Sequence, residues 1–191
     1  MRKLKLQMQL SVDGYVAGPN GELDWMTWNL DDGLIQFIND LTDSSGTILL
    51  GRKMTDGFMN YWEGVVNNQP ESPEYPFAKK MVDTPKVVFS KTLPASKWTN
   101  TTLANGNLAD EIANLKNQSG KDIIVYGGAG FVSSLIKEGH IDEFNLFVNP
   151  VMINKGMRIF DLADKRQKLS LMDTTAYPCG ITVLRYQLAR E

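Results

Sequence analysis

The chain has 191 residues, of which 42% are hydrophobic and 22% are charged, and its formal net charge at pH 7 is −2. These values are typical of a globular protein, and we expect one domain over residues 1–191. The small net charge argues against a general binder of nucleic acid or of anionic membrane surfaces. Cys179 is the only cysteine, which excludes an intrachain disulfide and fits a cytoplasmic protein. No segment reaches the roughly 18 apolar residues of a membrane span.

Patterns typical of strands and helices alternate along the chain. Strand patterns cover residues 4–10, 47–50, 86–89, 99–103, 122–126, 143–149, 168–177 and 181–188. Helical patterns cover residues 31–41, 55–62, 75–82, 108–117 and 131–137. This alternation predicts an α/β layered domain with a mostly parallel sheet. Residues 178–180 predict a turn between the last two strands, which would form an antiparallel hairpin at one edge, and residues 65–76 favour a loop.

The most informative segment is the apolar strand 122–126, which is followed by Gly127-Gly128-Ala129-Gly130 and a helical pattern from Phe131. Glycines allow the backbone to approach a bound phosphate, while the N–H groups and dipole of a helix start favour its negative charge. The alternative is that the glycines close this turn for packing alone. Ser133 stands where the third glycine of the full dinucleotide fingerprint would be, so the segment by itself leaves both interpretations open.

Two further strand ends carry residues suited to binding phosphate. They are Gly51, Arg52, Lys53 and Thr55 after the strand 47–50, and Ser90 and Lys91 after the strand 86–89. Thr55 is the expected N-cap of the following helix. Because parallel sheets bind ligands beyond the carboxyl ends of their strands, we expect both junctions and the glycine turn to face one crevice. Together the three junctions predict a nucleotide-binding site.

The order of these junctions resembles the cofactor-binding order of the dihydrofolate reductase superfamily. Residues 11–21 (Ser-Val-Asp-Gly-Tyr-Val-Ala-Gly-Pro-Asn-Gly) and residues 139–160 are similar to one branch, the reductase domain of bacterial riboflavin biosynthesis and its stand-alone relatives. The resemblance covers nearly the whole chain. It implies a three-layer α/β/α sandwich of the dihydrofolate-reductase-like kind and NADPH as the hydride donor.

The resemblance also implies which loops contact NADPH. The implied residues are Val16, Ala17 and Gly18 at the nicotinamide, Gly51, Arg52, Lys53 and Thr55 at the adenosine-side phosphates, Ser90 and Lys91 near the 2′-phosphate, and Gly127, Gly128, Ala129, Gly130 and Phe131 at the pyrophosphate.

The substrate side matches the family less closely. Trp28-Asn-Leu resembles the opening of the pteridine-facing helix, but Gly33 stands where the pteridine-binding acid falls, which argues against folate reduction. Tyr15 stands where the riboflavin branch usually has a basic residue, which argues against a phosphoribosyl substrate. The candidate substrate contacts are Trp25, Trp28, Phe37 and Tyr126. Core packing is the alternative for the tryptophans.

The proton donor stays open among Asp13, Asp31, Asp32 and water. A turn residue is the alternative role for Asp13, and a helix N-cap or solvated first-turn carboxylate is the alternative for Asp31 and Asp32. His140 is the only histidine, and one histidine with one distant cysteine predicts no metal site.

These observations predict an NADPH-dependent reductase that transfers hydride to a small planar heterocycle of the pyrimidine or pterin kind. We expect a homodimer, since relatives in this branch often pair, and no nucleic-acid or membrane partner. The alternatives are a non-catalytic NADP(H)-binding module and a dimeric structural relative that has lost turnover.

Overall fold

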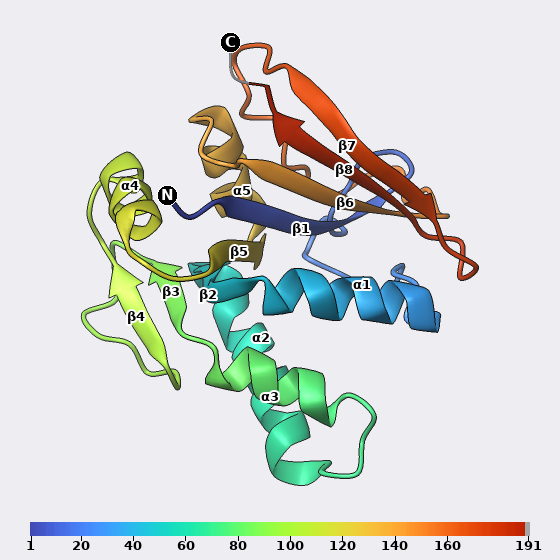
Figure 1. Ribbon diagram of the computed structural model, residues 1–191, viewed down its shortest axis with the longest axis horizontal. Coiled ribbons are helices and arrows are strands. Elements are labelled where there is room, and N and C mark those ends of the chain that lie inside the picture. Colours follow the sequence, from blue (N-terminus) through green and yellow to red (C-terminus); the bar gives the residue numbers. More distant parts are fainter. Residues whose placement is uncertain (190–191) are drawn as a thin grey trace.

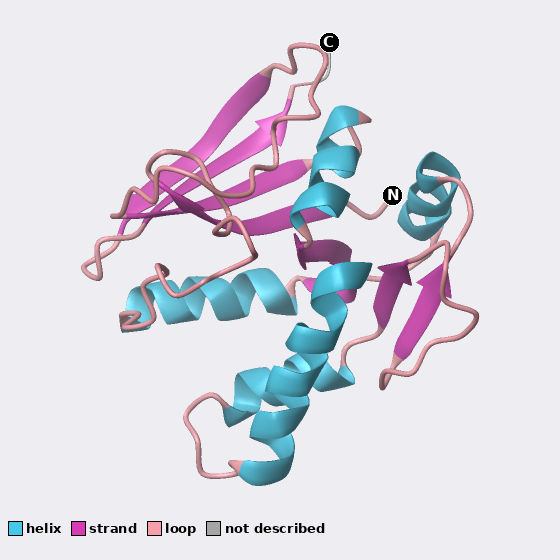
Figure 2. Ribbon diagram, turned by 180° about the vertical axis from the view of Figure 1, so that it is seen from behind, coloured by secondary structure: helices cyan, strands magenta, loops and turns pink. Residues whose placement is uncertain are grey.

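A computed structural model describes residues 1–189, so the last two residues of the expected domain lie outside the described range. Eight strands form one sheet in the order β4-β3-β2-β5-β1-β6-β8-β7 (Figures 1 and 2). The strands are β1 (Leu4–Ser11), β2 (Ser45–Gly51), β3 (Lys86–Phe89), β4 (Thr101–Ala104), β5 (Asp122–Gly127), β6 (Glu143–Asn149), β7 (Leu169–Ala176) and β8 (Thr182–Leu188). Within residues 1–189, none of the helices combines the length and the apolar character that a membrane crossing requires.

The six neighbouring strands from β4 to β6 all run parallel. β8 runs antiparallel to β6, and β7 runs antiparallel to β8. The prediction of a mostly parallel sheet with a C-terminal antiparallel hairpin is therefore confirmed. Because the six strands share one direction, the loops that follow β1, β2, β3, β5 and β6 all leave from the same edge of the sheet, which we call the carboxyl edge.

Helices cover both faces of the sheet and make the predicted three-layer sandwich (Figure 1). On one face lie α4 (Leu108–Asn117) and α5 (Ala129–Lys137), which pack against β1, β5 and β6. On the other face lie α1 (Asp32–Asp43), α2 (Arg52–Asn68) and α3 (Tyr75–Asp83). Neighbouring residues in a strand point to opposite faces, so Ile48 and Leu49 of β2 enter different cores, and both are buried.

The helix after β2 differs from its prediction at both ends. α2 begins at Arg52 and continues to Asn68, so the loop expected over residues 65–76 is shorter and starts only after this helix. Gly51 is the N-cap residue, and the prediction that Thr55 caps this helix is wrong. Thr55 lies fully buried in the first turn, where its hydroxyl donates a hydrogen bond to the carbonyl oxygen of Gly51 at 3.0 Å. Thr55 therefore stabilises the turn from strand to helix.

Candidate functional site

The three junctions singled out in the sequence lie side by side at the carboxyl edge. In the register of the parallel strands, Leu50 of β2 is opposite Gly127 of β5, and Gly51 is opposite Phe89 of β3. The Phe89 ring packs on the ring of Phe131, the third residue of α5, with 4.8 Å between the ring centroids. The loops after β2, β3 and β5 therefore meet along one rim.

At this rim the backbones of two turns lie so close together that neither has room for a side chain. Gly127 and Gly128 have positive φ angles of 149° and 86°, a conformation that other residues rarely adopt. A Cβ atom added to Gly128 would lie 2.8 Å from the Cα atom of Gly51. α2 begins after Gly51 and α5 begins after Gly128, and neither N-cap has a side chain that bonds the helix. Two helix N-termini, each with N–H groups that lack an intrahelical partner, thus lie next to each other.

Basic side chains surround a carboxylate at the start of α2. Arg52 Nη1 lies 3.5 Å and Lys97 Nζ lies 2.8 Å from the carboxylate of Asp56, and the indole Nε1 of Trp98 donates to it at 3.0 Å. The Lys97 hydrogen bond, together with that of Trp98, holds the pKa of Asp56 below its usual range. Sequence reasoning found Arg52 but missed Asp56, Lys97 and Trp98. The four-residue spacing of Arg52 and Asp56 on one helix was the available signal.

Ser90 and Lys91 follow β3 in different environments. Ser90 is buried, and its hydroxyl oxygen accepts hydrogen bonds from the backbone N–H groups of Thr92 at 3.3 Å and Leu93 at 3.2 Å. These bonds shape the turn that carries Lys91. Lys91 and Lys53 are both exposed, so their charges are available at the rim that the glycine turns form.

The loop with Val16, Ala17 and Gly18 pairs with the loop after β6. Val16 and Ala17 are buried. In a short antiparallel contact, the N–H of Val16 donates to the carbonyl oxygen of Met157, and the N–H of Met157 donates to the carbonyl oxygen of Ala17. Gly156 allows this contact, because a Cβ atom there would collide with the carbonyl oxygen of Ala17. This loop therefore has a defined position beside the carboxyl ends of β1 and β6.

Asp13 holds the same two loops together. Its carboxylate accepts hydrogen bonds from the backbone N–H groups of Asn154 at 2.8 Å and Ile153 at 3.2 Å. The Ser11 hydroxyl and these N–H groups hold the pKa of Asp13 below its usual range. Asp13 is thus an ionised acceptor at neutral pH.

Asp31 and Asp32 differ sharply in their contacts. Asp31 is the N-cap of α1, as one interpretation of the sequence expected, and its carboxylate accepts from the N–H of Leu34 at 3.1 Å. It also accepts from the N–H of Cys179, in the turn between β7 and β8, at 3.2 Å. Asp32 is exposed in the first turn of α1. Asp31 therefore connects α1 to the hairpin.

The four aromatic candidates for the substrate site do not form one cluster. Trp28 is 67% exposed, and the indole of Trp25 donates to the carbonyl oxygen of Glu22 at 3.1 Å. Phe37 of α1 packs on the Phe147 ring, with centroids 5.9 Å apart. Tyr126 of β5 shares a 2.8 Å hydrogen bond with Thr42. Phe37 and Tyr126 line the region between α1 and the sheet, while Trp28 projects from the loop before α1.

Sequence reasoning also missed a polar row beneath α1, which consists of Gln7, Asn145 and Arg185. These residues are neighbours across β1, β6 and β8 in the observed register. The alternation of polar and apolar residues in β1 was the available signal, but alternation by itself favours a face in solvent. β1 instead lies in the middle of the sheet, so its polar residues lie between the sheet and α1.

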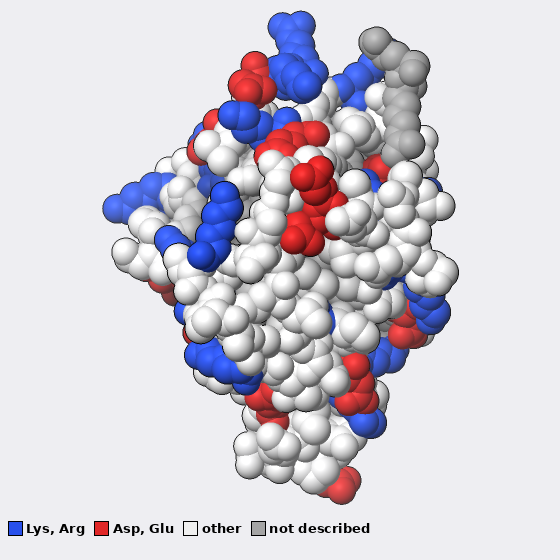
Figure 3. Space-filling view, turned by 90° about the vertical axis from the view of Figure 1, so that its left-hand side faces the viewer, with Lys and Arg blue, Asp and Glu red and all other residues white. Residues whose placement is uncertain are grey.

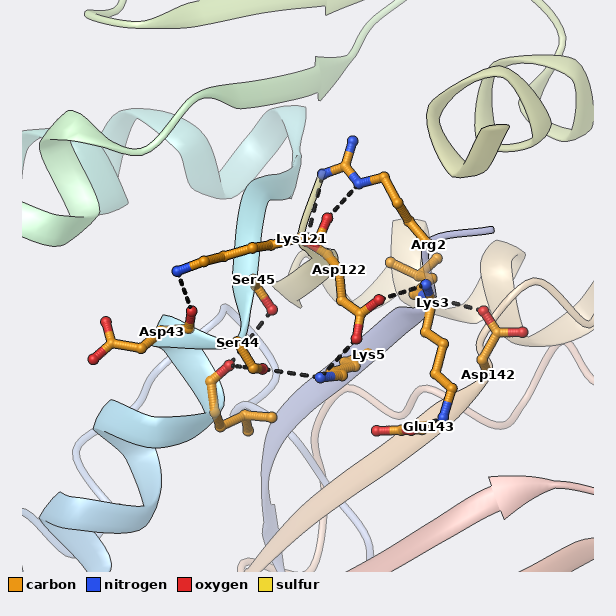
Figure 4. Close-up of polar contacts among 12 residues, drawn as sticks. Arg2, Lys3, Lys5, Asp43, Ser44, Ser45, Lys121, Asp122, Asp142 and Glu143 are labelled. Atoms are coloured by element: carbon orange, nitrogen blue, oxygen red, sulfur yellow. Dashed lines mark hydrogen bonds and ion pairs between the residues drawn. The ribbon is translucent and has the colours of Figure 1, made fainter. Parts of the chain in front are cut away.

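Ion pairs gather at the opposite, amino edge of the sheet (Figure 4). Lys3 pairs with Glu143 at 2.6 Å, and Lys5 pairs with Asp122 at 2.9 Å. A hollow of about 440 Å³ at this edge is lined by Lys3, Glu143 and Gln187, among others. It lies away from the strand ends at which parallel sheets bind ligands. On the face drawn in Figure 3, basic and acidic side chains are mixed and form no continuous basic patch.

Comparison with known proteins identifies the family of this chain. The sequence model of the RibD C-terminal domain matches residues 2–183. The chain belongs to the RibD C-terminal domain family. Protein YyaP of Bacillus subtilis (strain 168) is 32% identical over 186 residues, which cover 97% of this chain and 94% of YyaP.

Two solved structures share the fold of this RibD C-terminal domain protein. A Shewanella sp. PV-4 protein, described as a riboflavin biosynthesis protein, superposes with a TM-score of 0.71 at 22% identity, and both chains are fully covered. Dihydrofolate reductase from Enterococcus faecalis, in a complex with NADP(H), superposes with a TM-score of 0.61 at 13% identity, covering 98% of this chain and 97% of that chain. The expected dihydrofolate-reductase-like fold is confirmed, and the family model confirms the expected riboflavin-biosynthesis branch.

This RibD C-terminal domain lacks a basic residue at position 15, but a cation from another loop lies next to Tyr15. The guanidinium of Arg158 lies over the Tyr15 ring, 4.4 Å from its centroid, and its Nη2 donates to the Tyr15 hydroxyl at 2.8 Å. Arg158 comes from the loop after β6 and is exposed. The absence of a basic residue at position 15 therefore does not leave this part of the site without positive charge.

Proposed function

We propose that this protein is an NADPH-dependent reductase that transfers hydride to a small planar heterocycle of the pyrimidine or pterin kind. The observation that carries the proposal is the contact between the backbones of Gly51 and Gly128, which brings the N-termini of α2 and α5 together. Two such N-termini with exposed lysines beside them favour a ligand with several phosphate groups. Membership of the RibD C-terminal domain family supports the same assignment.

The residues at the carboxyl edge fit a nicotinamide dinucleotide. The turn from Gly127 to Phe131 has no side chain at the point of closest backbone approach, which suits a pyrophosphate. Arg52, Lys53 and Lys91 would bind the adenosine-side phosphates, with Ser90 and Thr55 stabilising the turns that carry them. Val16, Ala17 and Gly18 would border the nicotinamide. NADPH, when bound, supplies the hydride, so the protein needs no nucleophilic side chain.

We infer that neither Asp13 nor Asp31 supplies the proton for the reduction, which leaves Asp32 and water as its source. Asp13 is held ionised by the N–H groups that bind it, and the carboxylate of Asp31 is occupied by two backbone N–H groups. Both contacts favour a role in positioning loops rather than in proton transfer. The contacts of this chain therefore support Asp13 and Asp31 as residues that hold the site in shape.

Titration calorimetry with NADPH and NADH tests the cofactor. We expect NADPH to bind more tightly than NADH because the 2′-phosphate adds two charges that Arg52 and Lys91 can bind. NADPH oxidation, followed at 340 nm with a panel of pyrimidines and pteridines, tests turnover. Binding of neither cofactor would overturn the proposal, and binding without oxidation of any compound would favour the non-catalytic module.

The homodimer and the cytoplasmic location stay predictions. β7 is an edge strand with exposed apolar residues, among them Leu171 and Met172, which supports pairing through the C-terminal strands. Light scattering of the wild-type chain beside a Leu171→Lys variant tests this, and a monomeric wild type would contradict it.

A further inference from the structure

One polar residue of the central strand β1 stands out beneath α1. Gln7 is paired in register with Asn145 of β6, which is paired in turn with Arg185 of β8. All three lie on the α1 side of the sheet. Asn145 and Arg185 are each two residues away from Phe147 and Val183, which pack with Leu34 of α1, so they point to the same face. Gln7 shares that face because it is paired in register with Asn145.

Asn145 and Arg185 are hydrogen-bonded to each other. Asn145 is buried, its amide nitrogen donates to the carbonyl oxygen of Leu6 at 3.1 Å, and its oxygen accepts from Arg185 Nε at 3.3 Å. The Arg185 guanidinium lies over the Phe37 ring, 5.4 Å from the centroid. These contacts fix two of the three members of the polar row without any ligand.

Gln7 is the exception. Its side-chain oxygen Oε1 is buried and has no hydrogen-bond partner, and it is the single such side-chain atom in residues 1–189. The residue as a whole remains partly accessible to solvent, although β1 is flanked by strands on both sides. Buried polar atoms are nearly always hydrogen-bonded, so a buried polar atom without a hydrogen bond needs an explanation, such as a ligand that binds to it. A rotation of this partly accessible carboxamide would present the unpaired acceptor to a ligand that enters between α1 and the sheet.

The position of Gln7 connects it to the proposed cofactor site. Leu6 of β1 is opposite Val125 of β5, so Gln7 lies beside the end of β5, where the turn at Gly127 begins. A flat ring that contacts Gln7 would therefore lie next to the glycine turn that is proposed to hold the pyrophosphate.

We propose that Gln7 determines which ring edge the reductase accepts, and that it selects a cyclic amide edge with an N–H beside a C=O. This inference rests on the proposed function. A carboxamide offers one acceptor and one donor, so it pairs with such an edge through two complementary hydrogen bonds. A diamino-substituted ring that is protonated on the ring nitrogen N1 presents two donors, N1–H and the 2-amino N–H, which a carboxylate accepts and a carboxamide does not. Gly33 leaves α1 without a carboxylate at the position where the family resemblance expects one.

Calorimetry on the full chain with saturating NADPH tests the inference with two probes. Lumazine carries cyclic amide edges, and 2,4-diaminopteridine carries the two-donor edge when N1 is protonated. We expect the wild type to prefer lumazine, Gln7→Leu to lose about tenfold in lumazine affinity, which corresponds to about 1.4 kcal/mol, and Gln7→Glu to prefer the diamino compound. Gln187→Leu, an exposed glutamine of β8, is the matched control and should leave both affinities unchanged.

Each variant must also bind NADPH as the wild type does and unfold no earlier on heating, which shows that the fold is intact. Equal lumazine affinity in wild type and Gln7→Leu would overturn the inference, and so would a wild-type preference for the diamino compound. If neither probe binds although NADPH does, the inference is again overturned while the cofactor proposal survives. If NADPH itself does not bind, the proposed function fails, and titrations of the probes without NADPH then decide the role of Gln7.

Discussion

Gly51 and Gly128 come from turns that are far apart in the chain, yet a Cβ atom on Gly51 would lie 2.9 Å from the Cα atom of Gly128. Real Cβ atoms are not found so close to a backbone carbon, so neither position has room for a side chain. The contact joins the end of β2 to the end of β5 and sets the distance between the starts of α2 and α5. Any ligand held by both helix N-termini depends on this contact.

The first prediction concerns Gly128→Ala. We expect the free energy of unfolding to fall by at least about 1–2 kcal/mol, because alanine is strained at a φ of 86° and its methyl group collides with Gly51. NADPH affinity should fall as well. Urea denaturation and calorimetry measure the two effects. Gly130→Ala is the matched control for stability, since its added methyl group meets nothing within 4 Å. An equal loss of unfolding free energy in Gly130→Ala would contradict the argument that the contact with Gly51 excludes a side chain at Gly128.

The second prediction concerns Arg52. Arg52→Gln removes a charge at the start of α2, and we expect NADPH to bind about tenfold more weakly while NADH affinity changes little. Lys97 remains to neutralise Asp56 in this variant, so the fold should be kept. Arg166→Gln, in an exposed loop whose neighbour Gln167 contacts the far end of α5, serves as the control. An equal loss of affinity for NADPH and NADH would show that Arg52 does not bind the 2′-phosphate.

The third prediction separates the two neighbouring carboxylates of α1. Asp31→Ala should cost about 1 kcal/mol of unfolding free energy because it removes an N-cap, whereas Asp32→Ala should cost only a few tenths, roughly the effect of one exposed charge near a helix start. Asp31→Asn retains an N-cap oxygen and should keep both stability and turnover. Thermal unfolding and the NADPH oxidation assay measure these properties. A loss of turnover in a stable Asp31→Asn variant would make Asp31 a catalytic residue.

The fourth prediction concerns pH and Asp122 (Figure 4). Burial alone would raise the pKa of this carboxyl, but the hydrogen bond from the N–H of Lys3 at 2.8 Å and the ion pair with Lys5 outweigh it and hold the pKa below its usual range. A lowered pKa in the folded state means that the unfolded chain binds the proton first on acidification. The stabilisation from Asp122 is therefore complete above about pH 4 and is lost as the pH falls through the folded-state pKa.

Urea denaturation of wild type and Asp122→Asn across this range tests the assignment. The wild type should be more stable than the variant at pH 7, and the difference should shrink below about pH 4. A difference that stays constant down to about pH 2 would mean that the Asp122 charge contributes nothing to the acid sensitivity of the fold.

Sequence patterns located two buried strands accurately. β3 and β6 have the predicted ends, because their apolar residues lie in the core and the chain leaves the core just beyond them. α2 was mispredicted at both ends. Its first turn contains the charged residues Arg52 and Lys53, which do not fit the apolar periodicity that predicts a helix. Its last turn lies in a polar segment that favoured a loop. Local patterns do not report the packing of α2 on α3, in which the ring centroids of Trp62 and Phe77 lie 5.3 Å apart.

The sequence by itself determined the order of strands and helices, the parallel core and the glycine turns at two strand ends, because residue type and spacing largely decide which residues are buried and where the backbone can turn tightly. Only the tertiary structure decided which of those turns touch, that Asp56 gathers Arg52, Lys97 and Trp98, and that Gln7 is left with an unpaired oxygen under α1. Such facts depend on the sheet order, which makes β1 a central strand and β7 an edge. Strand order arises from long-range pairing, and no local pattern encodes it.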